Sequence, residues 1–144
     1  MTQKIERTFT VAQPASHVWS YLSDFRSTND WDPGTEQTTL ASGDGGVGTV
    51  YENVSSFAGK KVEITYTVQA LDPGRQITLL GESSSFTATD TITVEASGAG
   101  STVTYEAEFE FHGLARLADP FMSLPLKKLG DDAQKSLKET LESL

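Results

Sequence analysis

The sequence predicts an α+β fold in which a curved, antiparallel, seven-stranded sheet surrounds one long C-terminal helix, with two short helices after the first strand. Two patterns lead to this prediction. Apolar and polar residues alternate along much of the chain, and short turns separate the alternating segments, as in antiparallel strands with one covered face. The end of the chain instead repeats its leucines every three or four positions, so an amphipathic helix is available to cover the sheet.

The composition excludes several classes of protein. The 144 residues fit one domain, spanning 1–144, and include no cysteine, which excludes disulfides, thiolate catalysis and Cys-ligated zinc. The formal net charge of −9 argues against nucleic acid, which requires a basic surface. No apolar run has the length of a signal peptide core or a membrane span. We therefore expect a cytoplasmic monomer or homodimer that neither binds nucleic acid nor inserts into a membrane.

The first strand and the helices that follow it occupy the N-terminal part of the chain. Residues 5–11 alternate between apolar and polar side chains, as a half-buried strand does. Pro14 suits the first turn of a helix, and apolar residues at helical spacing predict a helix over about 14–23 and a short second turn that reaches Asn29. Trp31 follows in a polar stretch. We expect its ring to cap the core while its indole N–H meets a backbone carbonyl or water.

Six further strands are predicted from alternation and from the turns between them. They cover residues 35–41, 49–55, 62–68, 76–80, 86–94 and 103–111. The turns are the glycine-rich segment 43–48, a bend at Ala58-Gly59, a type II turn at Asp72-Pro73-Gly74, and residues 97–101. The glycine-rich segment lacks the Lys-Ser/Thr of a phosphate-binding loop, so it is interpreted as a hairpin turn.

The C-terminal helix is predicted from an apolar stripe with helical spacing. The stripe consists of Leu126, Leu129, Ala133, Leu137, Leu141 and Leu144. Four residues extend it backward, namely Leu114, Leu117, Phe121 and Leu124, and the prolines at 120 and 125 should kink or divide this first part.

Short motifs occur in a fixed order along this framework. They are PASHVWSYLSD at 14–24, WDP at 31–33, GVGTVY at 46–51, LDPGR at 71–75, STVTY at 101–105 and HGLARLADP at 112–120. Together with the order of elements, they resemble the START-like, or helix-grip, superfamily (SRPBCC, Bet v 1-like), and in particular its bacterial polyketide cyclase/dehydrase-like branch. The resemblance covers essentially the whole chain. It implies a cavity between the sheet and the C-terminal helix for a lipid, polyketide or related hydrophobic metabolite.

Asp90 is the main candidate for chemistry, and Arg7 is the second. By alternation, Asp90 shares the apolar face of its strand with Phe86 and Ile92, where burial would raise its pKa and suit a general acid or base. Arg7 shares the parity of Ile5 along its strand, so it could point to the same face and pair with Asp90. Alternatively, Asp90 turns outward at a bulge or lies at the open end of the cavity. We favour a polar ligand anchor over catalysis, and assign no firm catalytic residue.

The other expected ligand contacts are aromatic or aliphatic. Tyr66 and Tyr105 lie on apolar strand faces, where a hydroxyl can orient a ligand; each could equally be a core residue with its hydroxyl at the rim. The remaining candidates for the cavity wall are Phe57, Phe86, Phe109, Phe111, Leu117 and Phe121. These side chains either line a cavity or simply fill it.

No cofactor or metal is expected. The two histidines, His17 and His112, have no neighbouring histidine or carboxylate cluster in the sequence, as a metal site would need. His17 is expected to be exposed. No G-x-S-x-G motif indicates a serine nucleophile.

Three functions are compatible with these observations. The preferred one is binding of a small hydrophobic molecule in the cavity. The second is a cyclase or aromatase type of enzyme in which Asp90, Arg7 or a tyrosine moves protons. The third is a protein-interaction module, which requires an exposed apolar patch and no cavity; the Thr- and Glu-rich outward strand faces argue against it.

Overall fold

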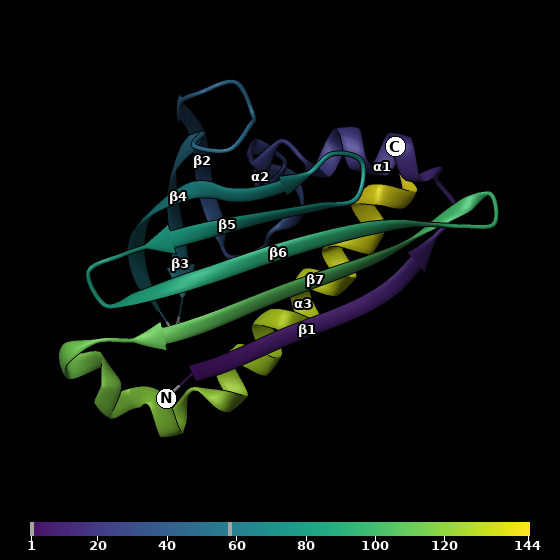
Figure 1. The fold of residues 1–144 in the computed structure, drawn as a ribbon. Coiled ribbons are helices and arrows are strands. Elements are labelled where there is room, and N and C mark those ends of the chain that lie inside the picture. The colour runs from purple at the N-terminus through teal and green to yellow at the C-terminus, as the bar shows by residue number, and fades with distance from the viewer. Residues whose placement is uncertain (1, 58) are drawn as a thin grey trace.

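Seven strands form one antiparallel sheet in the order β1-β7-β6-β5-β4-β3-β2 (Figure 1). The computed structural model describes residues 2–57 and 59–144, and the side chains of all of these except 118 and 119. The strands are β1 (Thr2–Val11), β2 (Thr35–Ser42), β3 (Val50–Phe57), β4 (Lys60–Asp72), β5 (Gln76–Glu82), β6 (Phe86–Ser97) and β7 (Gly100–Phe111). The first strand of the chain pairs with the last, and the others pair with their sequence neighbours. The predicted fold class is confirmed.

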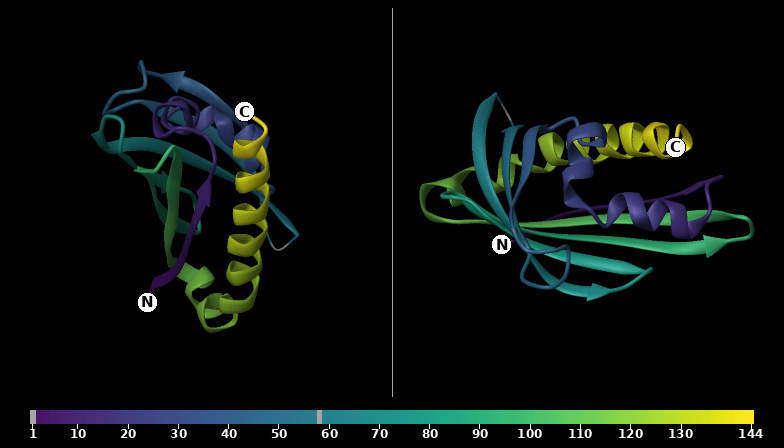
Figure 2. Two further views of the ribbon diagram at one scale, coloured as in Figure 1. Left: turned by 90° about the vertical axis from the view of Figure 1, so that its right-hand side faces the viewer. Right: turned by 90° about the horizontal axis from the view of Figure 1, so that it is seen from above.

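The helices follow the predicted order. They are α1 (Ala15–Leu22), the 3₁₀ helix η1 (Phe25–Ser27), α2 (Thr28–Trp31), the 3₁₀ helix η2 (Gly113–Phe121) and α3 (Ser123–Glu142). Figure 2 shows α3 crossing the concave face of the sheet, on the same side as α1 and α2. The second helical turn runs two residues beyond the predicted end at Asn29 and therefore includes Trp31.

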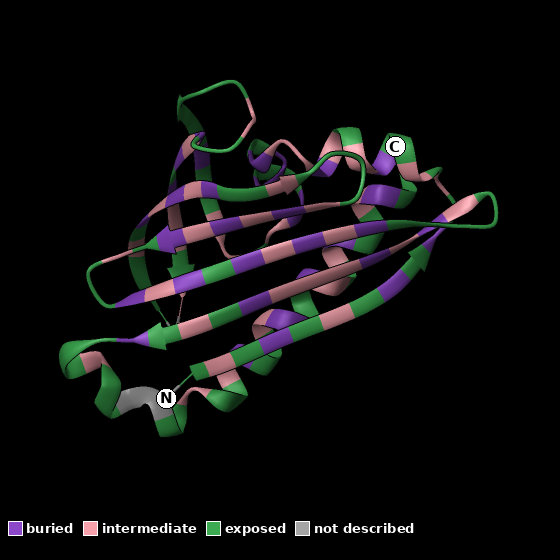
Figure 3. Cartoon of the chain, in the orientation of Figure 1, coloured by how far each residue is buried: buried purple, intermediate pink, exposed green. Residues whose placement is uncertain are grey.

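Alternating burial along the strands places the core between the sheet and α3 (Figure 3). On β6, every second residue from Phe86 to Val94 is buried. On α3, the buried stripe contains Leu126, Ala133, Leu137 and Leu141. Because side chains alternate across a strand, the inner face of β6 includes Asp90.

A bulge and a turn give the sheet its curvature and register. Gly74 has a φ of +82°, and the Arg75 N–H donates to the Asp72 carbonyl, as the predicted type II turn requires. The β4–β5 pairing shifts register between Val68 and Ala70, and bulges of this kind bend strands. Ala58, the first residue of the predicted bend at 58–59, lies outside the described residues.

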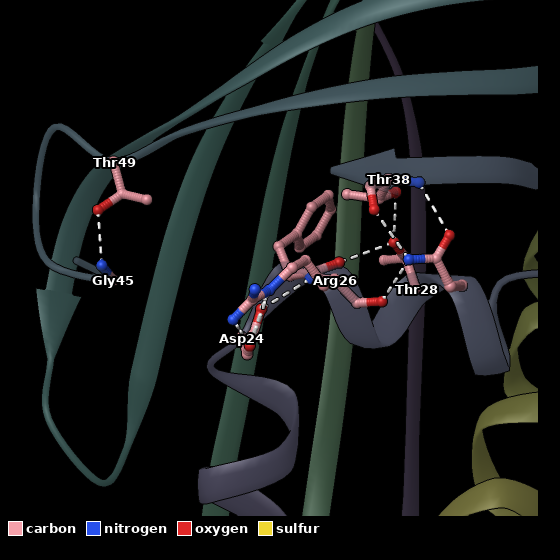
Figure 4. A network of polar contacts seen from close by, with 8 residues as sticks. Asp24, Arg26, Thr28, Thr38, Gly45 and Thr49 are labelled. Atoms are coloured by element: carbon pink, nitrogen blue, oxygen red, sulfur yellow. Dashed lines mark hydrogen bonds and ion pairs between the residues drawn. The ribbon is translucent and has the colours of Figure 1, made fainter. Parts of the chain in front are cut away.

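A chain of hydroxyl hydrogen bonds fixes the junction between α2 and β2 (Figure 4). The Thr28 hydroxyl donates to the Phe25 carbonyl over 2.7 Å and lies 2.7 Å from the Thr38 hydroxyl. Thr38 must therefore donate to Thr28, and its oxygen accepts from the Asn53 amide over 2.8 Å. Buried polar groups that are all partnered hold a rigid geometry, so the loop that follows α2 starts from a fixed point.

Trp31 packs in the core as predicted. It is 1% exposed, and its ring lies edge-on to Tyr105 with centroids 5.6 Å apart. Its indole N–H donates to the Ser27 hydroxyl over 3.1 Å. The expected backbone carbonyl or water partner was wrong, because the helical turn brings Ser27, four residues earlier, beside the indole.

The expected backward extension of the apolar stripe was wrong. Leu114, Leu117, Phe121 and Leu124 are all largely exposed. Gly113, with a φ of +57°, turns the chain as it leaves β7, and η2 then runs as a separate 3₁₀ helix before α3 begins. Leu114, Leu117 and Phe121 therefore do not continue the buried face of α3, and Leu124, in the first turn of α3, lies off that face.

Candidate ligand-binding site

A cavity lies between the inner face of the sheet and α3. Its volume is about 60 Å³, and since one water occupies roughly 10–15 Å³ on this measure, it has room for only a few waters. The lining residues come from the α2–β2 loop and from β3, β4, β6, β7 and α3. They are Asp32, Gly34, Ser55, Ser56, Phe57, Val62, Ile64, Tyr66, Phe86, Asp90, Tyr105, Phe109, Phe111, Leu126, Leu129 and Ala133.

Asp90 is buried at this cavity, on the face that alternation predicted. It is 4% exposed, and its Oδ2 accepts a hydrogen bond from the Tyr105 hydroxyl over 3.3 Å. Its Oδ1 is buried without a hydrogen-bond partner among the described residues. Burial and the negative charge of Asp32 raise the pKa of Asp90 to about 7, although the Tyr105 hydrogen bond opposes this. The carboxyl can therefore hold or release a proton near neutral pH.

Both candidate tyrosines reach the cavity, each from a different strand. Tyr66 comes from β4 and Tyr105 from β7, and both line the space beside Asp90. Burial, followed by the charge of Asp90, raises the pKa of each hydroxyl well above its usual value, so both stay protonated and can donate hydrogen bonds. Tyr66 rests on Phe25, with ring centroids 4.7 Å apart.

Gly81 makes the room that the Tyr66 ring occupies. A Cβ at residue 81 would lie 2.6 Å from Cε1 and 2.9 Å from Cδ1 of Tyr66. Residue 81 pairs with Tyr66 across β4 and β5, so the two side chains would stand on the same face of the sheet. Only a residue without a side chain fits under the ring.

Asp32 is a lining residue that the sequence analysis did not identify. Its Oδ1 accepts from the Gly34 N–H over 3.0 Å, and its Oδ2 accepts from the Thr35 hydroxyl over 2.9 Å. Burial raises its pKa despite these two bonds. Asp32 stands in the WDP motif at 31–33, which was used only for the family resemblance; the loop after α2 carries its carboxylate to the cavity.

Arg7 does not pair with Asp90. Its guanidinium forms an ion pair with Asp131 on α3, at 2.9 Å, and donates to the Lys127 carbonyl. The parity argument was correct in directing Arg7 toward the helix side. It failed because the pairing partner lies on the helix that packs directly over β1, whereas Asp90 lies on β6, with β7 between β6 and β1.

Two predicted contacts lie outside the cavity. Leu117 is 74% exposed and Phe121 is 78% exposed, because η2 projects away from the sheet. The other aromatic candidates, Phe57, Phe86, Phe109 and Phe111, do line the cavity. His17 and His112 are exposed and lie away from it.

The chemistry of the site follows from this arrangement. Apolar walls can bury a hydrophobic ligand, and two carboxyl groups and two phenol hydroxyls supply polar contacts. Among the described lining residues none is Lys, Arg or His. Over the described part of the chain, no three His, Cys, Asp or Glu side chains gather as metal ligands would, and no helix is both long and apolar enough to cross a membrane.

Comparisons with known proteins agree with the fold. Residues 2–142 match the model of a family described as polyketide cyclase / dehydrase and lipid transport. Among solved structures, the Zhui aromatase/cyclase from Streptomyces sp. R1128 has a TM-score of 0.84 at 18% identity, with 99% of this chain and 94% of that chain covered. A comparison with curated proteins gives no match.

Two further solved structures extend this likeness. A START superfamily protein from Mycobacterium smegmatis has a TM-score of 0.75 at 16% identity, covering 97% of this chain and 94% of that one. The major latex-like protein 151 from Panax ginseng has a TM-score of 0.73 at 17% identity, covering 99% and 96%. At these identities the likeness concerns the fold, and function has to be argued from the site.

Proposed function

Because the chain belongs to the polyketide cyclase / dehydrase and lipid transport family, we propose that it binds a small hydrophobic molecule in the cavity between the sheet and α3. One observation carries the proposal: a cavity walled mainly by aromatic and aliphatic side chains contains a buried carboxyl oxygen for which the described residues offer no partner. Binding would bury apolar ligand surface, and the polar groups would set the orientation.

The size of the cavity limits the ligand. A volume of about 60 Å³ admits only a very short chain without change, so a longer chain or a polycyclic molecule would require side chains to move apart. Phe109 and Phe111 on β7 and Phe86 on β6 meet with ring centroids 5.8–6.4 Å apart and form one wall. Rotation of these rings would enlarge the space.

Native mass spectrometry of the purified protein, followed by denaturation, tests the proposal. We expect a fraction of the protein to carry a small apolar molecule that denaturation releases. A panel of short-chain amines, alcohols and carboxylates should also raise the melting temperature, since a ligand that binds only the folded state stabilises it. An unliganded mass together with no thermal shift from any compound of the panel would contradict the proposal.

A second candidate function is acid–base catalysis of the cyclase type. The observation that favours it is the Asp90–Tyr105 pair, because the pKa of Asp90 near 7 suits a general acid or base at neutral pH. One similar structure is named as an aromatase/cyclase. With a poly-β-ketone substrate, Asp90→Asn should abolish turnover and leave binding intact, whereas the binding proposal expects no turnover by either form.

The interaction-module alternative finds partial support. The exposed apolar residues of η2 fit its requirement for an exposed patch, but it also requires the absence of a cavity, and a cavity lies between the sheet and α3. We therefore prefer ligand binding over this alternative.

A further inference from the structure

The two carboxyl groups of the cavity differ in how many hydrogen bonds they already accept. Asp32 already accepts two hydrogen bonds from its own loop. Asp90 accepts one, at Oδ2, and its Oδ1 has no partner among the described residues although the side chain is 96% buried. A buried acceptor without a donor destabilises the folded state, so the site is completed by a ligand that brings a donor.

The titratable groups around Asp90 are all acidic side chains. Asp32, Tyr66 and Tyr105 are the titratable groups that face it from the α2–β2 loop, β4 and β7, and α3 presents Leu126, Leu129 and Ala133. None of the described lining residues carries a positive charge. Arg7 is held by Asp131 beside β1 and lies outside the lining.

These groups discriminate between ligand head groups. A carboxylate brought to the cavity would face two acidic side chains without a compensating cation, and like charges repel strongly in a buried site. A hydroxyl could donate to Oδ1. An amine could donate and also balance the charge of Asp90, which makes the hydrogen bond shorter and stronger.

We propose that the cavity binds small apolar amines, with the ligand nitrogen donating a hydrogen bond to Oδ1 of Asp90 and the hydrocarbon part lying against Phe86, Phe109 and Leu126. This inference rests on the proposed function and names the ligand class for the same cavity. The volume of about 60 Å³ favours a short, unbranched hydrocarbon, and a chain as long as hexyl requires the rings of Phe86, Phe109 and Phe111 to move apart. The Tyr105 hydroxyl holds the other carboxyl oxygen in place.

The pH dependence of amine binding gives a second way to test the inference. A primary alkylamine is protonated below about pH 10, and its positive charge favours the ionised form of Asp90. Where Asp90 is partly protonated, binding of the ammonium form therefore releases a proton from Asp90 to solvent. Affinity for the amine rises as pH increases from 6 to 8.

The test compares hexylamine, 1-hexanol and hexanoate, which share one hydrocarbon chain, by titration calorimetry and amide NMR shifts at pH 8. We expect hexylamine to bind about tenfold more tightly than hexanoate, or better, with 1-hexanol between them. In Asp90→Asn the amine should lose this advantage. In Asp72→Asn, where the lost carboxylate is exposed at the β4–β5 turn and remote from the cavity, it should keep it.

The outcomes separate the inference from the function it rests on. Equal or tighter binding of hexanoate, or an amine affinity that does not rise between pH 6 and 8, overturns the amine inference and leaves hydrophobic binding intact. Binding of none of the three overturns the amine inference, and together with an unliganded mass in native mass spectrometry it overturns the proposed function as well. Should Asp90→Asn fail to fold, the wild-type series and its pH dependence decide the question without it.

Discussion

Asp90 and Tyr105 meet diagonally across β6 and β7, where the Tyr105 hydroxyl donates a 3.3 Å hydrogen bond to Oδ2 of Asp90. The strand register pairs Asp90 with Ala107 and Ile92 with Tyr105, so the two side chains lie on the same face, two residues apart. Diagonal neighbours are within reach of long side chains. The sheet itself thus assembles the polar centre of the cavity.

The burial of Asp90 predicts a pH-dependent stability. Its folded-state pKa is about 7, above the unfolded value of about 3.9, so the folded state binds this proton more tightly. The stabilising contribution is complete below pH 4 and is lost as pH rises through 7, which amounts to about 2–3 kcal/mol between pH 5 and 8. Asp90→Asn removes the titration, and its free energy of unfolding should gain that amount relative to wild type over the same range.

Urea denaturation of both proteins at pH 5 and pH 8 measures this difference. The control is Asp72→Asn, which removes a carboxylate that is exposed beside Arg75 and does not line the cavity. A constant difference between wild type and Asp90→Asn would show that Asp90 does not titrate in this window.

Removal of the Tyr105 hydroxyl should raise the pKa of Asp90 further. The hydrogen bond from Tyr105 lowers that pKa, because a donor favours the charged form of a carboxyl group. In Tyr105→Phe, the carboxyl ¹³C shift of Asp90 should titrate at higher pH than in wild type, and stability at pH 8 should fall by about 1–3 kcal/mol. Tyr21→Phe is the matched control, since that hydroxyl donates to Asp30 outside the cavity. An unchanged Asp90 titration in Tyr105→Phe would contradict the assigned bond.

The sequence predicted the fold well because alternation and helical spacing report directly on burial. The order of elements and the inner position of Asp90 followed from these periods and are confirmed. The packing of Trp31, which was expected from its large aromatic ring, is also confirmed. The START-like resemblance is also confirmed by the family match and the similar structures.

The sequence could not predict features that depend on where a loop, a long side chain or a helix points in three dimensions. Asp32 was not singled out, because the path of the loop after α2 depends on the contacts of Thr28 and Thr38 and cannot be read from the sequence of the loop. Arg7 has the correct parity, but parity does not say which neighbour a long side chain reaches. In the sequence, Leu117 continues the helical spacing of the C-terminal leucines. In the structure, it lies on η2, a separate helix that begins at the turn at Gly113.

Gly81→Ala should destabilise the protein by overpacking. The new methyl group would lie 2.6 Å from the Tyr66 ring, and the ring would have to shift into the cavity. Overpacking of this kind typically costs about 1–3 kcal/mol, and the displaced ring should also weaken ligand binding. Thermal denaturation and calorimetric titration with hexylamine measure the two effects.

Gly46→Ala is the control for this substitution. Its new Cβ would come no nearer than 3.3 Å to a described neighbour, the exposed Asp44 side chain, so a stability change within about 0.5 kcal/mol is expected. If Gly81→Ala were equally mild, the Tyr66 ring would not be confined as described.

The exposed residues of η2 provide a final test, because they separate a wall of the cavity from a surface segment. Leu117 and Phe121 are more than 70% exposed, so Leu117→Ser and Phe121→Ser should change the free energy of unfolding by no more than about 0.5 kcal/mol. Leu137→Ala, on the buried face of α3, should cost about 2–5 kcal/mol. Since neither residue of η2 lines the cavity, hexylamine affinity should also be unchanged in both serine variants. A severalfold loss of affinity with unaltered stability would show instead that η2 folds over the bound ligand. Leu117 and Phe121 would then line the cavity when a ligand is present, as the sequence analysis expected.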